Sequence, residues 1–281
     1  GQYLASGSDE GMCCIWKHGY PEDESLRYWW NTGHRANIFC AKFLPTGENN
    51  VVCTASGDCH IHVYDINQGS RGLSESTRGT DEFLLEPFKK YECHLDRVKK
   101  LGPVSAAVFL SAAEDGTIRR FDIRAPHACC LTAGSFRPGH RCKDTLLAYQ
   151  RNREFCSIAV RPLNASQFIV AGSTADVLLY DQRMPKLPVS TYLPYEESEG
   201  RITGVAFNWN GLQIAANYSL RGVYTMDVDG PITGYAPPSS PQSSDSDGEG
   251  GAAGSRALVG NSDDEGGAPL VEEEGTAANM E

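Results

Sequence analysis

The sequence lacks several patterns that would indicate a membrane protein or a familiar class of enzyme. No stretch approaches the roughly 18 consecutive apolar residues that a transmembrane helix needs, and no signal peptide is visible. The chain also contains no Gly-x-x-x-x-Gly-Lys phosphate loop, no His-Glu-x-x-His zinc motif and no Gly-x-Ser-x-Gly nucleophile turn. We therefore expect no membrane partner, no cofactor and no catalytic residue.

An excess of basic residues is also missing from most of the chain. The net charge is -11, but residues 231–281 hold ten acidic residues against one basic residue, Arg256. This segment carries a charge of -9 and leaves -2 for residues 1–230. Because nucleic-acid binding requires a concentrated basic face, the charge balance argues against a nucleic-acid partner.

Cysteine is plentiful, with ten residues, but no Cys-x-x-Cys pair occurs. Several cysteines lie inside apolar segments, where a small soft side chain packs well, which is typical of reduced cysteine in an intracellular protein. Four residues could converge on zinc: Cys129, Cys130, His140 and Cys142. Their spacing matches no common zinc finger, so we expect loop residues without a ligand role.

His60 and His62 are a second pair that could bind a metal. They flank Ile61 on a predicted strand, so both side chains should point to one face. No third ligand is evident from the sequence, and solvent-facing histidines are the expected alternative. The sequence therefore predicts no metal site.

The pattern that is present recurs five times. In each copy a short apolar strand runs into a turn rich in Gly or Asp, and a second strand then ends on an aromatic or large residue, usually followed by Asp. The copies cover residues 4–16, 51–65, 109–122, 168–181 and 212–227. The closing aromatics at 16, 64, 121 and 180 lie 48, 57 and 59 residues apart, which fits four-stranded units of roughly 40 to 45 residues with loop insertions. One unit cannot bury both of its faces, so the units must stack.

A further apolar or alternating segment precedes most copies and predicts an opening strand. These segments cover residues 37–43, 98–101, 155–160 and 202–207. Two long inserts, 66–90 and 125–154, interrupt the repeats and are candidates for partner contact or disorder, with a solvated loop as the alternative. We expect residues 1–230 to form one all-β domain. Because the chain opens part-way through a repeat without Met, we also expect it to be a piece of a longer protein.

Residues 231–281 are rich in Ser, Gly and acidic side chains and have too little apolar surface to fold. We expect a disordered tail or linker. Four of its serines stand beside or just before acidic residues, the context that an acid-directed kinase accepts: Ser243, Ser244, Ser246 and Ser262. Phosphorylation would deepen the negative charge of this segment. The alternative is a plain solvating spacer.

The repeats resemble those of the WD repeat family of β-propellers. The resemblance rests on strand pairs that end in aromatic-Asp and on His34 and His94 ahead of opening strands, and it covers about residues 1–230. It implies an all-β propeller with about five blades present here, as part of a seven-bladed propeller. In that family a histidine, a turn aspartate and a closing tryptophan form a network that stabilises each blade. The resemblance implies the pairs His34 with Asp58 and His94 with Asp115.

The sequence departs from this family in its closing residues. Only Trp16 is the family's tryptophan, and Lys17 rather than Asp follows it. Phe121 has no hydrogen-bonding group in its ring, so its blade cannot complete the network as the family does. The last two copies also lack the histidine.

Two segments are similar to the Trp-Asp-x-Arg signature of receptors that dock on the cullin-4 ubiquitin ligase: Phe121-Asp122-Ile123-Arg124 and Tyr180-Asp181-Gln182-Arg183. Residues 33–45 and 91–99 also look like the cullin-4-associated factor branch, in particular the type that joins WD and tetratricopeptide repeats. The resemblance implies that Asp122, Arg124, Asp181 and Arg183 contact the adaptor of that ligase.

The residues alone give a separate reason to consider Arg124 and Arg183. Each lies two residues past an aspartate that ends a strand, so its side chain should project from the edge of a sheet. A planar guanidinium with five donors suits an interface carboxylate or carbonyl, and Arg is common among binding hot spots. The alternative is an arginine paired with its own neighbouring aspartate, which is worth about 0.5 kcal/mol.

Together these patterns predict a non-catalytic interaction protein that recruits targets to a cullin-4 ligase for ubiquitination. Its partners would be the ligase adaptor and protein substrates that the sequence does not identify, in the nucleus, the cytoplasm or both. The alternative is a general WD repeat scaffold or a chromatin-associated adaptor without a ligase. An enzyme that uses a propeller channel is disfavoured because no acid, base or metal set converges in the sequence.

Overall fold

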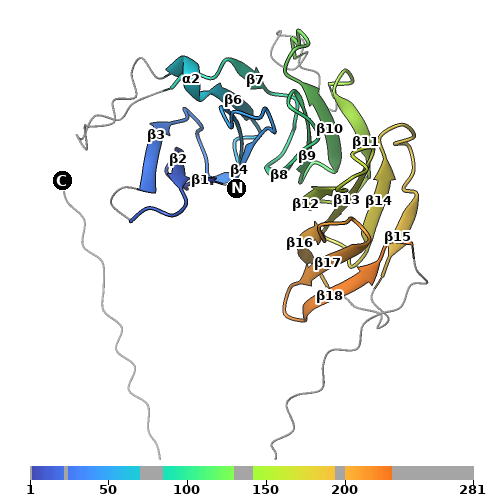
Figure 1. Cartoon of the computed structure of the whole chain (residues 1–281). Coiled ribbons are helices and arrows are strands. Elements are labelled where there is room, and N and C mark those ends of the chain that lie inside the picture. The colour runs from blue at the N-terminus through green and yellow to red at the C-terminus, as the bar shows by residue number, and fades with distance from the viewer. Residues whose placement is uncertain (1, 22–24, 70–84, 130–141, 194–199, 230–281) are drawn as a thin grey trace, which may run out of the picture. The chain divides into compact units, whose positions relative to one another are not determined.

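The computed structural model describes residues 2–21, 25–69, 85–129, 142–193 and 200–229. This part of the chain is built of β-strands, with one short helical turn, α2 (Ile66–Gly69). The strands form five sheets that follow one another in chain order (Figure 1). No helix among these residues has the length and apolar character to cross a membrane.

Each sheet corresponds to one sequence repeat. The first sheet contains β1 (Tyr3–Gly7), β2 (Met12–Lys17) and β3 (Leu26–Asn31). The second contains β4 (Ile38–Phe43), β5 (Val51–Ser56), β6 (Ile61–Asp65) and β7 (Lys89–Tyr91). The third contains β8 (Val98–Pro103), β9 (Val108–Ala113), β10 (Thr117–Asp122) and β11 (Leu146–Tyr149). The fourth contains β12 (Phe155–Val160), β13 (Gln167–Gly172), β14 (Val177–Asp181) and β15 (Ser190–Tyr192). The fifth contains β16 (Ile202–Phe207), β17 (Gln213–Tyr218) and β18 (Gly222–Asp227), and neighbouring strands of all five are antiparallel.

The predicted opening strands are confirmed as β4, β8, β12 and β16, with bounds that differ by two residues at most. Each of these strands has a register shift just after its first residue, as between Ile38 and Cys40 in β4. A bulge of this kind bends a strand and strengthens its twist. Its recurrence at one position in four sheets shows that the sheets are copies of one unit.

The outer strands are the elements that the sequence pattern did not predict. β11 lies inside the insert 125–154, and β7 begins inside the insert 66–90, so neither insert is wholly loop. β7 and β15 are only three residues long, which is too short for an alternation of apolar and polar residues to be recognised.

The core lies between consecutive sheets. In the second sheet, Val52 and Tyr64 pack toward the first sheet, whereas Cys53 and Val63 point the other way and pack against Phe109 of the third sheet. Because middle strands are covered on both faces, all six residues of β5 and all six of β9 are buried. Each large apolar side chain buried in these layers contributes about 1.5 to 3 kcal/mol of transfer free energy. The fold class predicted from the sequence, an all-β stack of repeated sheets, is thus confirmed.

Replacing Gly172 by Ala tests how tightly β13 meets the start of the fourth sheet. An added methyl group would overlap the backbone carbonyl oxygen of Glu154, which cannot give way as a flexible side chain could. We expect Gly172→Ala to lower the free energy of unfolding by about 1 to 3 kcal/mol in urea titrations. Gly204→Ala is the control, because a methyl there meets no atom within 4 Å and should change stability by less than about 0.5 kcal/mol. Equal stability of the two variants would contradict the packing described.

Candidate functional site

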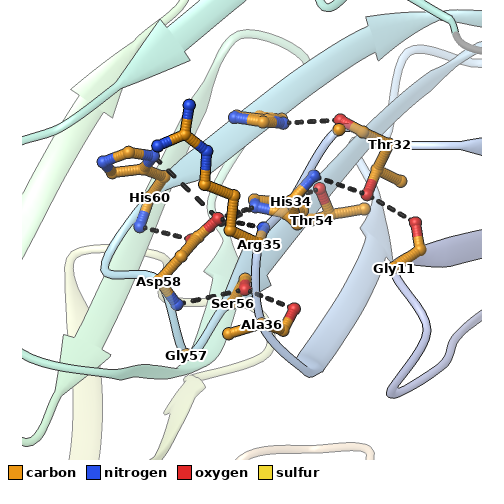
Figure 2. Close-up of polar contacts among 12 residues, drawn as sticks. Gly11, Thr32, His34, Arg35, Ala36, Thr54, Ser56, Gly57, Asp58 and His60 are labelled. Atoms are coloured by element: carbon orange, nitrogen blue, oxygen red, sulfur yellow. Dashed lines mark hydrogen bonds and ion pairs between the residues drawn. The ribbon is translucent and has the colours of Figure 1, made fainter.

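A polar cluster lies at the edge of the second sheet where the chain enters β4 and β6. The carboxylate of Asp58 accepts hydrogen bonds from His34 Nδ1 at 3.0 Å, from the Arg35 amide at 2.9 Å and from the His60 amide at 3.0 Å (Figure 2). The other ring nitrogen of His34, Nε2, lies 2.9 Å from Thr54 Oγ1. The structure therefore brings together His34 and Asp58, the first pair expected from the resemblance.

These contacts keep the carboxyl group of Asp58 ionised. Burial alone would raise the pKa of its carboxyl, but the hydrogen bonds from His34 and from two backbone amides hold that pKa well below its usual range. At neutral pH the carboxylate is ionised, and it links the segment before β4 to the turn before β6. Hydrogen bonds to a charged group contribute about 1.5 to 3 kcal/mol each, so the cluster fixes the start of both strands.

His62 lies beside this cluster, and the prediction that it faces solvent is wrong. Its residue surface is 1% exposed, and its ring stacks on that of His34 with centroids 3.9 Å apart. Its Nδ1 is 3.0 Å from the carbonyl oxygen of Thr32. The reason is that neighbouring sheets cover both faces of β6, so alternation along this strand turns no side chain to water. His60, in the turn before the strand, is partly exposed, with 32% of its side chain accessible.

The third sheet has a similar cluster around His94 and Asp115. His94 Nδ1 lies 3.2 Å from Asp115 Oδ2, and its Nε2 lies 2.6 Å from Ser111 Oγ. The hydroxyl of Thr117 donates to Asp115 Oδ1 at 2.6 Å. Phe121 takes no part in these hydrogen bonds, and the hydroxyls of Ser111 and Thr117 make polar contacts that its ring cannot. Burial would raise the pKa of Asp115, but the contacts with His94 and the hydrogen bonds from Thr117 and the Leu95 amide together hold that pKa below its usual range.

The fourth sheet uses an arginine where the preceding two use a histidine. Arg153 Nη1 donates to both carboxylate oxygens of Asp176, at 3.1 and 2.9 Å. The sequence analysis missed this pair because its spacing differs from that of the third sheet. Arg153 stands two residues before β12, whereas His94 stands four before β8, and Asp176 stands one residue before β14, whereas Asp115 stands two before β10. The sequence did offer one signal for this pair, because Asp176 stands just before the apolar strand that ends in Tyr180-Asp181.

A different arrangement occurs where the third strands of two sheets end. Arg124 Nε and Nη2 donate to the two carboxylate oxygens of Asp122 at 2.9 and 2.7 Å, and the Arg124 amide donates to the same carboxylate at 3.0 Å. Arg183 makes the same three bonds to Asp181, at 2.9, 2.6 and 2.9 Å. The arginine side chains are nevertheless 73% and 75% exposed. Each arginine is thus both paired with its own aspartate and presented to solvent.

The two pairs belong to neighbouring sheets. β8 of the third sheet packs on β12 of the fourth, and one apolar cluster fills the space between these sheets. Because the sheets are copies of one unit, the ends of β10 and β14 lie at the same edge of the stack. The strands equivalent to β10 and β14 in the other described sheets are β2, β6 and β18, and they are followed at the same position by Gly19, Asn67 and Asp229. Among the described sheets, therefore, only these two adjacent ones carry the arginine.

Both aspartates of these pairs are stronger acids than an ordinary aspartate. The hydrogen bond from Arg124 lowers the pKa of Asp122 to about 2, and the hydrogen bond from Arg183 lowers the pKa of Asp181 to about 2. Each pair therefore consists of two charged groups at neutral pH and has no net charge. A partner would meet oriented N–H donors at this edge.

Some residues singled out from the sequence lie outside the described residues. These are Cys130, His140, Ser243, Ser244, Ser246 and Ser262. Phosphorylation of the four serines stays a prediction. Cys129 and Cys142 are described and are both buried.

The buried ring of His62 predicts a pH dependence of stability. Burial, together with the neighbouring His34, lowers the pKa of His62 to about 3, from 6.5 for an unperturbed ring. Below about pH 6 the unfolded chain binds a proton at this residue and the folded chain does not. The free energy of unfolding should therefore decrease as the pH is lowered, by up to about 1.4 kcal/mol per pH unit. His62→Phe keeps a flat ring on His34 but removes this titration. The urea-derived free energy of unfolding should then change less steeply between about pH 6 and pH 4.5, and the slope that remains includes buried His94, whose pKa is also lowered by burial.

His60→Phe is the matched control, because this ring is partly exposed and outside the stack. It removes a neighbouring histidine and leaves the stacked pair in place, so the slope of His62→Phe is compared with the slope of this variant. An identical slope in His62→Phe and the parent protein would show that His62 does not cause the dependence.

Comparisons with known proteins agree with the repeated architecture. Residues 25–65 match the WD domain, G-beta repeat family. The chain is 31% identical over 263 residues to Protein ALTERED SEED GERMINATION 2 of Arabidopsis thaliana, a match that covers 83% of this chain and 33% of that protein. It is 28% identical over 244 residues to DDB1- and CUL4-associated factor 6 of Homo sapiens and 27% identical over 272 residues to WD and tetratricopeptide repeats protein 1 of Homo sapiens. These two matches each cover 81% of this chain and span 26% and 35% of the relatives.

The structure resembles the crystal structure of the WD40 β-propeller domain of Doa1. The TM-score is 0.56 at 20% sequence identity, and the match covers 80% of this chain and 60% of the other. At this identity the likeness concerns the fold. The repeated four-stranded units, the matched repeat and this likeness together show that the chain carries a WD40 repeat domain with the fold of a β-propeller.

Proposed function

We propose that this chain is the substrate-receptor part of a cullin-4 ubiquitin ligase. It would dock on the ligase adaptor through the arginine edge, which we define as Asp122, Arg124, Asp181 and Arg183. The observation that carries the proposal is the duplication of one exposed, bidentate Asp–Arg pair on two adjacent sheets.

The geometry leaves both arginines able to bind a partner. A guanidinium has five N–H bonds, and Arg124 directs only one from Nε and one from Nη2 to Asp122. The remaining three N–H bonds are available to oxygens of another protein, and the same holds for Arg183. Because each pair is neutral as a whole, we expect the partner to offer carbonyl or hydroxyl oxygens as well as carboxylates.

The aspartates have a defined part in this proposal. A free arginine side chain loses rotational freedom when it binds, at a cost of about 0.5 to 1.5 kcal/mol. The bond to Asp122 or Asp181 holds the guanidinium in one orientation before the partner arrives. Preorganisation of this kind lets an exposed arginine act as a hot spot.

The similarity to known proteins supports the proposal. One relative is named for association with DDB1 and CUL4, and it matches this chain over most of the chain's length. Since the matches span only 26% and 35% of the two human relatives, the activity of a whole protein is part of what we propose.

The proposed mechanism requires no chemistry by the chain itself. One edge would hold the ligase adaptor, and another surface would hold the target, which raises the effective concentration of the target near a ubiquitin-loaded enzyme. Such a protein would act in the nucleus or the cytoplasm.

Replacing both arginines by alanine tests the docking edge. Each of Arg124→Ala and Arg183→Ala should weaken binding to DDB1 about 30-fold, which corresponds to a hot-spot loss of about 2 kcal/mol. The double variant should no longer recover DDB1 and cullin-4 from cell extracts. The free energy of unfolding in urea should fall by no more than about 1 kcal/mol for each exposed ion pair that is lost. Binding constants would be measured by calorimetry with purified DDB1.

Arg97→Ala is the matched control, because its side chain is 60% exposed and stands before β8, at the opposite edge of the third sheet. This variant should bind DDB1 as the parent does. Undiminished recovery of DDB1 by the double variant would reject the arginine edge as the docking site and leave a WD repeat scaffold without this contact.

Replacing the aspartates separates preorganisation from competition. If Asp122 and Asp181 orient the guanidinium groups, Asp122→Asn and Asp181→Asn should each weaken DDB1 binding roughly 2- to 10-fold, in line with the entropy of one ordered side chain. Tighter binding by the asparagine variants in the same titration would show instead that the aspartates compete with the partner.

A further inference from the structure

Three thiols and one imidazole meet at a single buried place near the third sheet. The Sγ atoms of Cys93, Cys129 and Cys142 and a ring nitrogen of His127 all lie within 4.8 Å of one another. The three cysteines are buried, and His127 is partly buried. Cys93 Sγ lies 3.0 Å from His127 Nε2, and Cys142 Sγ lies 3.8 Å from the same nitrogen.

These distances match what a tetrahedral metal site requires. With Zn–S bonds of about 2.3 Å and Zn–N bonds of about 2.0 Å, the ligand atoms of a tetrahedral site stand roughly 3.5 to 3.8 Å apart. The four atoms need only shift by a few tenths of an ångström to about 1 Å to take up those positions around one ion. Three sulfurs and one nitrogen are a ligand set that zinc takes in closed structural sites.

The origin of the four residues argues against ordinary core packing. Cys53 belongs to the same apolar cluster as Cys93, Cys129 and Cys142, but Cys53 and Cys13 lie within strands. In contrast, Cys93 lies in the connection between β7 and β8, and the other three lie between β10 and β11. Chain segments without regular structure have converged to place three sulfurs and a nitrogen side by side. Loop residues that pack only as small hydrophobes have no need to meet in this way.

A buried cation beside the cluster supports a metal with negatively charged ligands. The Arg119 side chain is fully buried, and its Nη1 donates to the carbonyl oxygen of Cys142 at 2.7 Å and to Thr145 Oγ1 at 2.9 Å. Its Nε and Nη2 have no hydrogen-bond partner among the described residues. A buried charge without a counter-charge is costly. A Zn²⁺ ion with three thiolates has a net charge of -1 and would balance Arg119.

We propose that Cys93, His127, Cys129 and Cys142 bind one structural zinc ion. With four protein ligands the site is closed, so its role is to stabilise the fold. The ion would tie both ends of the β10–β11 connection to the segment between the second and third sheets, close to His94 and its cluster. The sequence analysis considered Cys129 and Cys142 together with Cys130 and His140, and it expected no ligand role because their spacing matches no common zinc finger. It did not consider Cys93 and His127 as ligands. This proposal does not depend on the proposed ligase role.

Metal analysis of the purified protein tests the site directly. The protein, in the length made by its native cell, should contain about one zinc ion per chain after dialysis against metal-free buffer. X-ray absorption at the zinc edge should show three sulfur ligands and one nitrogen ligand. Chelation should lower the unfolding temperature, and added Zn²⁺ should restore it.

Substitutions assign the ligands. Cys93→Ser and Cys142→Ser should each reduce retained zinc at least about tenfold, whereas Cys59→Ser, a half-exposed cysteine in the turn before β6, should retain it in full. If the ligand variants do not fold, the absorption spectrum of the unaltered protein decides the question by itself.

Several results would overturn the proposal. These are a folded protein that takes up no zinc from zinc-containing buffer, full retention of zinc by Cys93→Ser, iron or copper in place of zinc, and a disulfide between two of the three cysteines in the native protein.

Discussion

Burial of the middle strands on both faces is the constraint on which the rest of the structure depends. A strand such as β5 has all six residues buried because one sheet lies on each side of it. No single sheet can provide this, so each repeat is stable only with its neighbours. The apolar layers between consecutive sheets also fix the relative position of the sheet edges. Everything that the edges carry, from hydrogen-bonded turns to exposed arginines, is positioned by this stacking.

The two edges of the third sheet differ in whether their polar groups are buried or exposed. At the edge where β8 and β10 begin, His94 and Asp115 are buried and bonded to each other and to hydroxyls, so their hydrogen-bonding capacity is used within the chain. At the opposite edge, Arg124 keeps N–H donors directed to solvent. Burial makes the first edge a stabilising element. Exposure makes the second the better candidate for contact with another protein.

The Cys–His cluster and the arginine edge are connected through the chain. His127 lies three residues after Arg124, so an ion bound at the cluster would anchor the segment on which Arg124 stands. Arg183 has no such anchor among the described residues, and its orientation depends on Asp181 alone. Loss of the ion would therefore affect the two arginines differently, although their bonds to aspartate are alike.

The sequence by itself determined the inner strands of the sheets, the repeat and the positions of Arg124 and Arg183, because alternation, turn residues and strand ends are local features. The pair of His34 with Asp58 came from resemblance to a family. Tertiary structure alone decided that His62 is buried, that Arg153 meets Asp176 and that Cys93 joins His127. Cys93 and His127 are 34 residues apart in the chain, and they are in contact because the stacked sheets bring two connecting segments to one place. Local patterns cannot encode such contacts, since the free energy that forms them comes from apolar surfaces elsewhere in the stack.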